Sequence, residues 1–457
     1  MRTKVVVALV LVWGLLGPGA QAVVIPDPGL EGAIRAAVGK PEGDLTVSDL
    51  AGLTELDAFG RDIADLTGLE YAVNLKKLDL TDNRVTDLSP ISKLVALEEL
   101  SFVRNRVRDL SPLSGLSQLR RLEASFNEIE DLSPLAGLRS LVELALSFNR
   151  IRDIAPLASL QTLEVLDLSL NDVLDLTPLA GLINLKWLLL MGNNVFDLSP
   201  LSHLENLRLL WIDLNGVTDL SPLAGLTELR EISSMQNAIS DLSPLAGLRN
   251  LEKLVLLGNN ISDVSPLAEL GCLRYLDLDH NAVADISPLA SLSELRFLDL
   301  SGNQVGSLAA LAGLTNLRVL GISGNPVWDL APLSGLKNLT KLIAVGARIA
   351  DLSPLAELTN LATLNLQGNR IRSVEPLASL AGLRDLLLGG NNVSDISPLA
   401  GLLRLEILDL SANSVSDFAP LLELPALRFL NATRILLKPE AREVLDELEE
   451  RGVRIIR

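Results

Sequence analysis

Few side chains in this sequence are suited to acid–base, nucleophilic or metal chemistry. The 457 residues include two histidines and one cysteine, Cys272. His203 lies in a segment expected to be solvated, whereas His280 follows Asp279 and stands near Asp277. A carboxylate beside an imidazole can move a proton or orient a metal ligand, but no nucleophile elbow, phosphate-binding loop or paired zinc-ligand spacing accompanies it. We therefore expect no catalytic residue, no cofactor and no enzyme, and interpret His280 as part of a binding surface.

A ladder of aspartates suggests a second chemistry, which is metal binding. Aspartate recurs at steps of 22 or 44 residues from Asp65 to Asp417. Calcium-binding solenoid repeats carry a Gly-Gly-x-Gly-x-Asp pattern, and that pattern is absent from the sequence. An aspartate that returns with a repeated turn is explained by hydrogen bonds to the backbone of that turn. We expect a structural ladder and no metal.

The same period governs most of the chain. Asparagine stands at 22-residue steps from Asn83 to Asn413, with Ala347 in place of one rung. Leucines alternate with polar residues before each asparagine, as in Leu78-Asp-Leu80, which predicts a short strand with one side buried. The asparagine is expected to end the strand and to bond backbone groups of its own loop and of the next repeat. The following Asp-Leu-Ser-Pro motif predicts a short helical turn, with Asp or Ser as its cap and proline at its first position.

Seventeen such repeats run over residues 53–426 without insertion or deletion. One repeat cannot bury enough apolar surface to offset the ordering of its own residues, so neighbours must stack. We predict an α/β solenoid with a parallel sheet on the concave side and short helical turns on the convex side. Residues 23–52, with a helix starting at Asp27-Pro28, are expected to form a helical cap, and residues 427–457 a helix-and-strand cap.

Residues 1–22 have the pattern of a secretory signal peptide. Arg2 and Lys4 precede an apolar run over residues 5–16, and Ala20-Gln-Ala22 is a small-x-small cleavage motif. The run is short for a membrane span. We expect cleavage after Ala22, a secreted, periplasmic or cell-surface location, and no transmembrane segment in the mature chain. Loss of the two cations changes the formal charge from −18 to −20, which argues against nucleic acid as a partner.

These features resemble those of bacterial internalin-type leucine-rich-repeat proteins. The signal peptide, the helical start over residues 25–34 and repeats of the form Asn-x-Val/Ile-x-Asp-Leu-Ser-Pro-Leu carry the likeness, which covers essentially the whole mature chain. The resemblance implies a curved leucine-rich-repeat stack. It also implies recognition of a partner protein on the concave sheet, since internalins that are adhesins bind host surface proteins there.

Repeat register indicates which side chains face the concave side. Counted from the first leucine of each repeat, the second, third, fifth, seventh and eighth residues point outward. Eight of the thirteen aromatic residues after the signal peptide take such positions, and exposed apolar clusters mark contact sites. Neighbouring aromatics could also simply stack along the sheet. We predict one partner-binding patch made of Phe126, Phe148, Leu170, Trp187, Leu189, Met191, Arg208, Trp211, Leu214, Met235, Tyr275, His280 and Phe297.

The later repeats look different at these positions. Glycines such as Gly324, Gly346 and Gly368 leave that half of the predicted face with few side chains that could contact a partner. The missing asparagine at Ala347, and Ser307 in place of the usual aspartate, predict a locally weaker stack.

Several functions remain open at this stage. The leading hypothesis is an exported scaffold that binds another protein. A second is a structural or polysaccharide-binding component of the envelope, because aromatic platforms also suit sugars. A third is an intracellular regulatory subunit of the phosphatase type, against which the signal peptide argues.

Overall fold

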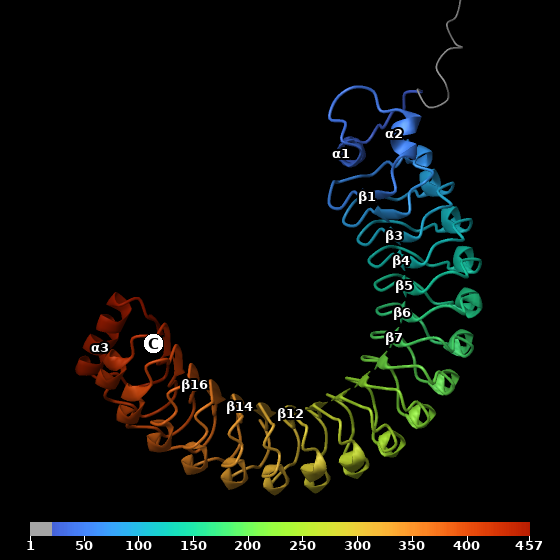
Figure 1. Cartoon of the computed structure of the whole chain (residues 1–457). Helices are drawn as coiled ribbons and strands as arrows, with labels where there is room; N and C mark the ends of the chain where they lie inside the picture. Colours follow the sequence, from blue (N-terminus) through green and yellow to red (C-terminus); the bar gives the residue numbers. More distant parts are fainter. Residues whose placement is uncertain (1–20) are drawn as a thin grey trace, which may run out of the picture. The chain divides into compact units, whose positions relative to one another are not determined.

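The computed structural model describes residues 21–457, so the basic start and apolar run expected of a signal peptide lie outside the described residues. Two compact units are present, residues 21–193 and 194–457, and each is described by itself. In each unit, parallel three-residue strands lie along the inner side of a bent stack and short helical turns lie along the other side (Figure 1). The α/β solenoid predicted from the 22-residue period is confirmed in both units.

The unit of residues 21–193 begins with two α-helices, α1 (Pro28–Val38) and α2 (Val47–Ala51). Seven strands follow: β1 (Glu55–Asp57), β2 (Lys77–Asp79), β3 (Glu99–Ser101), β4 (Arg121–Glu123), β5 (Glu143–Ala145), β6 (Val165–Asp167) and β7 (Trp187–Leu189). The turns between them are 3-10 helices: η2 (Leu69–Tyr71), η3 (Ser89–Ile91), η4 (Ser111–Leu113), η5 (Ser133–Leu135), η6 (Ala155–Ser159) and η7 (Thr177–Leu179).

The unit of residues 194–457 continues the same pattern and ends in a helix, α3 (Pro439–Glu450). Its strands are β8 (Leu209–Trp211), β9 (Glu231–Ser233), β10 (Lys253–Val255), β11 (Tyr275–Asp277), β12 (Phe297–Asp299), β13 (Val319–Gly321), β14 (Lys341–Ile343), β15 (Thr363–Asn365), β16 (Asp385–Leu387), β17 (Ile407–Asp409), β18 (Phe429–Asn431) and β19 (Arg454–Ile456). Its 3-10 turns are η8 (Ser199–Leu201), η9 (Ser221–Leu223), η10 (Ser243–Leu245), η11 (Ser265–Glu269), η12 (Ser287–Ser291), η13 (Ala309–Leu311), η14 (Ala331–Leu333), η15 (Ser353–Leu355), η16 (Glu375–Leu377), η17 (Ser397–Gly401) and η18 (Ala419–Glu423).

Strand pairing follows the 22-residue repeat within β1 to β7 and within β8 to β18, and the cap strand β19 pairs with β18 at an offset of 25 residues. Leu78 of β2 pairs with Leu100 of β3, and Leu254 of β10 with Leu276 of β11. Equivalent positions of successive repeats therefore form columns across each sheet. The leucine columns are fully buried, and the residues on either side of them point out of the core.

The asparagine ladder holds each repeat to the one before it. The side-chain amide of Asn105 donates to the carbonyl oxygens of Leu80 and Phe102, and its oxygen accepts from the amide of Val85. Leu80 and Val85 belong to the preceding repeat, so the prediction that the asparagine reaches the next repeat was wrong in direction. The buried amide leaves no polar side-chain group unsatisfied, which is what burial of a polar group requires.

The aspartate ladder braces the convex turns. Asp87 accepts the backbone amide of Ser89 at 2.7 Å and its hydroxyl at 2.8 Å. The residue at the N-cap of η3 is Leu88, which makes no side-chain cap bond, so the predicted Asp or Ser cap is instead an aspartate turn one residue earlier. The same bonds hold the pKa of Asp131, Asp219 and Asp263 below the ordinary value.

The two chain ends of the repeat array are covered by helices. Asp27 accepts the amides of Gly29 and Leu30 at the start of α1, and Gly39 ends that helix with a φ of 69°. Thr46 and Asp49 form a capping box on α2. On α3, Ala441, Leu445 and Leu448 are the buried residues; they cover the apolar surface that a last repeat would otherwise expose.

Candidate functional site

The partner-binding patch predicted from the sequence lies among the side chains that point outward from the strands. Throughout, the strand face means the second, third, fifth, seventh and eighth residues of each repeat. Residues of the predicted patch occur in both units. Phe126, Phe148, Leu170, Trp187, Leu189 and Met191 lie in residues 21–193; Arg208, Trp211, Leu214, Met235, Tyr275, His280 and Phe297 lie in residues 194–457.

The eighth residue of the repeats has a left-handed backbone. Phe126, Phe148 and Leu170 have φ values of 58°, 54° and 56°, and Leu214 and His280 have 54° and 52°. A residue with a side chain pays about 1–2 kcal/mol for this conformation, whereas glycine adopts it freely. The later glycines, Gly302, Gly324, Gly346, Gly368 and Gly390, have φ values of 63° to 70°. Glycine is thus the relaxed form of this position and occupies it in eight of the seventeen repeats, whereas the bulky residues carry the conformational cost.

The late strands of the first unit carry an apolar surface. Phe126 and Phe148 stack with ring centroids 4.1 Å apart and planes inclined by 13°. They are 40% and 46% exposed, and Trp187 on β7 is 50% exposed. Leu170, Leu189 and Met191, beside them, are half-buried. The apolar surface is defined here as Phe126, Phe148, Leu170, Trp187, Leu189 and Met191.

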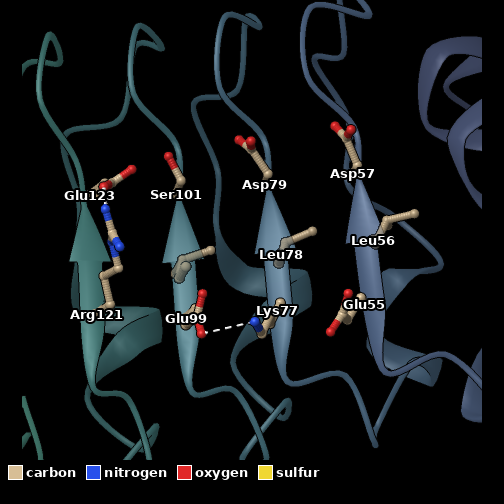
Figure 2. A pocket seen from close by; sticks show the side chains of 11 residues that line it. Glu55, Leu56, Asp57, Lys77, Leu78, Asp79, Glu99, Ser101, Arg121 and Glu123 are labelled. Carbon is tan, nitrogen blue, oxygen red and sulfur yellow. Dashed lines mark hydrogen bonds and ion pairs between the residues drawn. The ribbon is translucent and has the colours of Figure 1, made fainter.

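The early strands of the same unit form a charged hollow, which sequence reasoning missed (Figure 2). Its floor is the buried leucines of β1 to β3, and its polar lining is acidic overall. Lys77 pairs with Glu99 at 3.2 Å, and Arg121 pairs with Glu123 at 2.5 Å. The acidic hollow is defined here as Glu55, Asp57, Lys77, Asp79, Glu99, Ser101, Arg121 and Glu123. The sequence does carry a signal for this acidic hollow, because the fifth residue of each of the first two repeats is an aspartate, Asp57 and Asp79.

Trp211 of the second unit is held by its neighbours. Its indole Nε1 donates to Glu231 Oε1 at 2.9 Å, and the ammonium of Lys253 lies 5.7 Å from its ring centroid. Lys253 also pairs with Glu231 at 2.7 Å and lies 5.6 Å from the ring centroid of Tyr275. Trp211 is therefore part of a polar network, unlike the more exposed Trp187.

Tyr275 and Phe297 form a second aromatic stack, with centroids 4.0 Å apart and planes inclined by 2°. Aromatic pairs thus stack along the sheet in both units, as the alternative to a binding patch proposed. Glu252 neutralises part of the positive charge among the outward strand residues, because it pairs with both Arg230 at 3.2 Å and Arg274 at 3.1 Å.

His280 has an acidic neighbour but no further catalytic group. Its Nδ1 lies 2.6 Å from Asp279 Oδ1, and its ring is exposed. Burial, together with the charges of Asp299 and Asp279, raises the pKa of Asp277 to about 6, against the lowering effect of its hydrogen bond from the amide of Asp279. Within residues 21–457, no three His, Cys, Asp or Glu side chains gather as a metal site would require.

Two exposed aromatics outside the strand face were also missed. Phe196 and Trp328 are 60% and 67% exposed, and both stand at the twelfth residue of a repeat, between the Asn-x-Val segment and the ladder aspartate. The signal for them in the sequence is an aromatic residue at the twelfth position of two repeats, in the loop that follows the asparagine.

Comparison with known proteins adds the family. A family model described as Leucine Rich repeats (2 copies) matches residues 73–115, 117–159, 273–313, 293–335, 337–379 and 381–423, and a Leucine Rich repeat model matches residues 159–175. The crystal structure of an internalin, InlF, from Listeria monocytogenes is 33% identical, covers 74% of this chain and 94% of that one, and superposes with a TM-score of 0.63. The chain belongs to the internalin-type leucine-rich-repeat family.

Other similarities are narrower. Internalin H of Listeria monocytogenes is 42% identical over 60 residues, which is 13% of the internalin-type chain described here and 11% of that protein. A leucine-rich-repeat protein of Leptospira interrogans is 21% identical with a TM-score of 0.63, covering 90% of this chain and 97% of the other; at that identity it supports the fold alone. In the part of the chain that the structure describes, no helix is long and apolar enough to cross a membrane.

Proposed function

We propose that this internalin-type chain is an exported scaffold that binds a partner protein on its strand face. The observation that carries the proposal is the conformation of Phe126 and Phe148. Each is an exposed aromatic on a backbone with positive φ, in a column where eight of the seventeen repeats use glycine. Such residues gain little from burial and carry a conformational cost, which is the pattern expected of side chains kept for contact with something else.

A protein partner suits these rings better than a polysaccharide. A sugar stacks on the free face of an aromatic ring, but Phe126 lies between Phe148 and the guanidinium of Arg104, which is 5.4 Å from its centroid. Tyr275 likewise lies between Phe297 and Lys253. The rings therefore offer mainly their edges to solvent, which favours insertion among the side chains of a protein.

Export is the second part of the proposal. The predicted cleavage after Ala22 falls next to the helical cap, where the amide of Val47 donates to the carbonyl of Gln21 and that of Val23 to the carbonyl of Leu45. Sequencing the N-terminus of the chain recovered from outside the cytoplasm should give Val23. Recovery of the uncleaved chain from the cytosol would contradict export.

The binding proposal is tested by removing the exposed apolar groups without disturbing the core. We expect Phe126→Gly with Phe148→Gly and Trp187→Ser to abolish photocrosslinking of a partner protein, because the apolar contacts are lost while the backbone keeps a residue suited to it. The crosslinker would be placed at Met191, and adducts from envelope and host-cell extracts identified by mass spectrometry.

A matched control is Leu174→Ser. Leu174 is 52% exposed and belongs to the same unit, but it stands at the twelfth residue of its repeat and outside the strand face. It should leave every adduct in place. Adducts that persist in the triple variant, or that vanish equally in the control, would refute binding by the strand face.

A further inference from the structure

We propose that the strand face of residues 21–193 recognises a polypeptide with a lysine- or arginine-rich segment beside an apolar anchor. The basic segment lies in the acidic hollow, and the anchor lies on the apolar surface. This rests on the proposed function, since it specifies the chemistry of the partner at the same face.

The acidic hollow has an excess of carboxylates. Five acidic residues line it, against only two cations, Lys77 and Arg121. Both cations are already paired, Lys77 with Glu99 and Arg121 with Glu123 and, at 3.4 Å, with Glu143. The pKa of Lys77 is raised by its hydrogen bond to Glu99 and by the charges of Glu99 and Glu55, so the field around it is negative.

Three carboxylates of the hollow make no close ion pair, although Glu55 lies within the electrostatic reach of Lys77. Within residues 21–457, Glu55, Asp57 and Asp79 make no ion pair with lysine, arginine or histidine. Asp57 and Asp79 occupy paired positions on neighbouring strands, at the same ends of β1 and β2 (Figure 2). Each uses one oxygen to accept the amide two residues ahead, Phe59 or Thr81. The second oxygen of each is available to an incoming cation.

The charge pattern changes along the unit. On β6 and β7 the outward residues include Val165, Trp187 and Leu189, and the acids there are fewer: Asp167 remains, and Glu164 is paired with Lys186 at 2.7 Å. One end of the face thus attracts cations and the other excludes water around apolar groups. A ligand that satisfies both must be amphipathic along its length, as a polypeptide can be and a metal ion or a simple polyamine cannot.

Strand spacing sets the distance between the two contacts. From β2 to β7 there are five strand steps of about 4.8 Å, or about 24 Å in total. An extended peptide rises about 3.3 Å per residue, so about seven residues separate its basic cluster from its anchor. The acidic hollow would act through long-range attraction and pairing, and the apolar surface through burial.

The test uses random 20-residue peptides displayed on phage and selected on the purified chain at low salt. Selected peptides are synthesised and titrated by fluorescence anisotropy. We expect them to combine lysine or arginine with aromatic or aliphatic residues about seven positions away. Asp57→Asn with Asp79→Asn should weaken their binding on the order of fivefold and flatten its salt dependence, because two charge pairs are lost.

Asparagine preserves the local structure at this position. In the second unit Asn365 and Asn431 stand at the same place in their repeats and accept the amides of Gln367 and Thr433 in the same way. The matched control is Asp131→Asn, which removes one charge from the turn side of the same unit, where Asp131 bonds Ser133. It should leave the affinity and its salt dependence unchanged.

The outcomes separate this inference from the proposed function. The basic-segment inference is overturned if the selected peptides are acidic or neutral. It is also overturned if their affinity is unchanged by the Asp57→Asn and Asp79→Asn substitutions. If Trp187→Ser with Phe148→Gly still abolishes their binding, the strand face remains the site. Peptides unaffected by either pair of substitutions, or a selection that yields no binder, count against both.

Discussion

Phe126 and Phe148 stack face to face because the 22-residue register places them in one column, at a backbone position where both have positive φ. The stack contributes about 0.5–1.5 kcal/mol beyond simple burial. The left-handed backbone costs each residue a similar amount relative to glycine. The cost falls on both residues and the stacking gain is made once, so the stack does not offset the backbone cost of the pair.

This balance predicts an inverted order of stabilities at Phe148. Phe148→Gly should have a free energy of unfolding about 1 kcal/mol higher than that of Phe148→Ala, and so unfold at a higher urea concentration. Alanine keeps the backbone strain, whereas glycine relieves it. At Leu174, whose φ is not positive, the alanine variant should be the more stable one, as is usual. Equal stability of the two Phe148 variants would remove the argument from strain.

A second prediction concerns the missing asparagine rung. In the intact rungs, the asparagine oxygen accepts the amide twenty residues earlier, as Asn369 does from Ile349 at 3.1 Å. Ala347 cannot do this for Val327, a fully buried residue whose amide has no partner in the part of the chain that the structure describes. Ala347→Asn should stabilise the second unit by about 1 kcal/mol, because a buried donor becomes satisfied.

Amide exchange provides the site-specific measurement. The Val327 amide should exchange faster than the equivalent amides of Val305 and Ile349, which do have asparagine partners. The substitution should slow it to their rate. No change at Val327, with or without a change in overall stability, would show that this amide is not the weak point.

The converse substitution is Asn171→Ala in the first unit. The carbonyls of Leu146 and Leu168 would keep other asparagine partners, Asn149 and Asn193. The amide of Ile151 would lose the one hydrogen-bond acceptor that it has within residues 21–457, Asn171 Oδ1 at 3.0 Å. We expect a loss of about 1–3 kcal/mol in urea unfolding, the cost of one unsatisfied buried donor. A loss well below that would mean that the ladder contributes less than its burial implies.

The repeat architecture was readable from sequence because it depends on period and residue class. Leucine columns, the Asp27 start of α1 and the buried amides of Asn83 and Asn105 all follow from spacing and polarity. The direction of the asparagine bonds did not, because the same spacing connects a repeat equally to the one before it and the one after it. Only the curl of the loop after the strand decides that Asn105 reaches back to Val85.

The candidate site was less predictable, for a physical reason. Register tells which side chains leave the core, and it placed Trp187 and Trp211 on the same kind of surface. It does not give rotamers, so it could not show that Glu231 and Lys253 hold Trp211 while Trp187 stays exposed. The glycines in the column of Phe126 imply its positive φ, because glycine is the residue most favoured in that conformation.

The final prediction concerns Asp277, whose carboxyl is partly buried on β11. Burial, with the charges of Asp299 and Asp279, raises its pKa to about 6, well above the ordinary value of an aspartate. The folded chain therefore holds this proton more tightly than the unfolded chain. Stability from this group is fully present below about pH 4 and is lost as the pH rises through about 6.

Asp277→Asn removes that dependence. Since Asn365 fills the same position in another repeat, asparagine should keep the turn and stabilise the second unit above pH 6, while leaving its stability near pH 4 almost unchanged. Urea unfolding at both pH values, with a carbon-13 NMR titration of the Asp277 carboxyl, measures both quantities. Asp299→Asn should lower the titration midpoint, because a neighbouring negative charge is removed. A midpoint near 4 in the original chain would mean that burial does not disfavour the Asp277 anion.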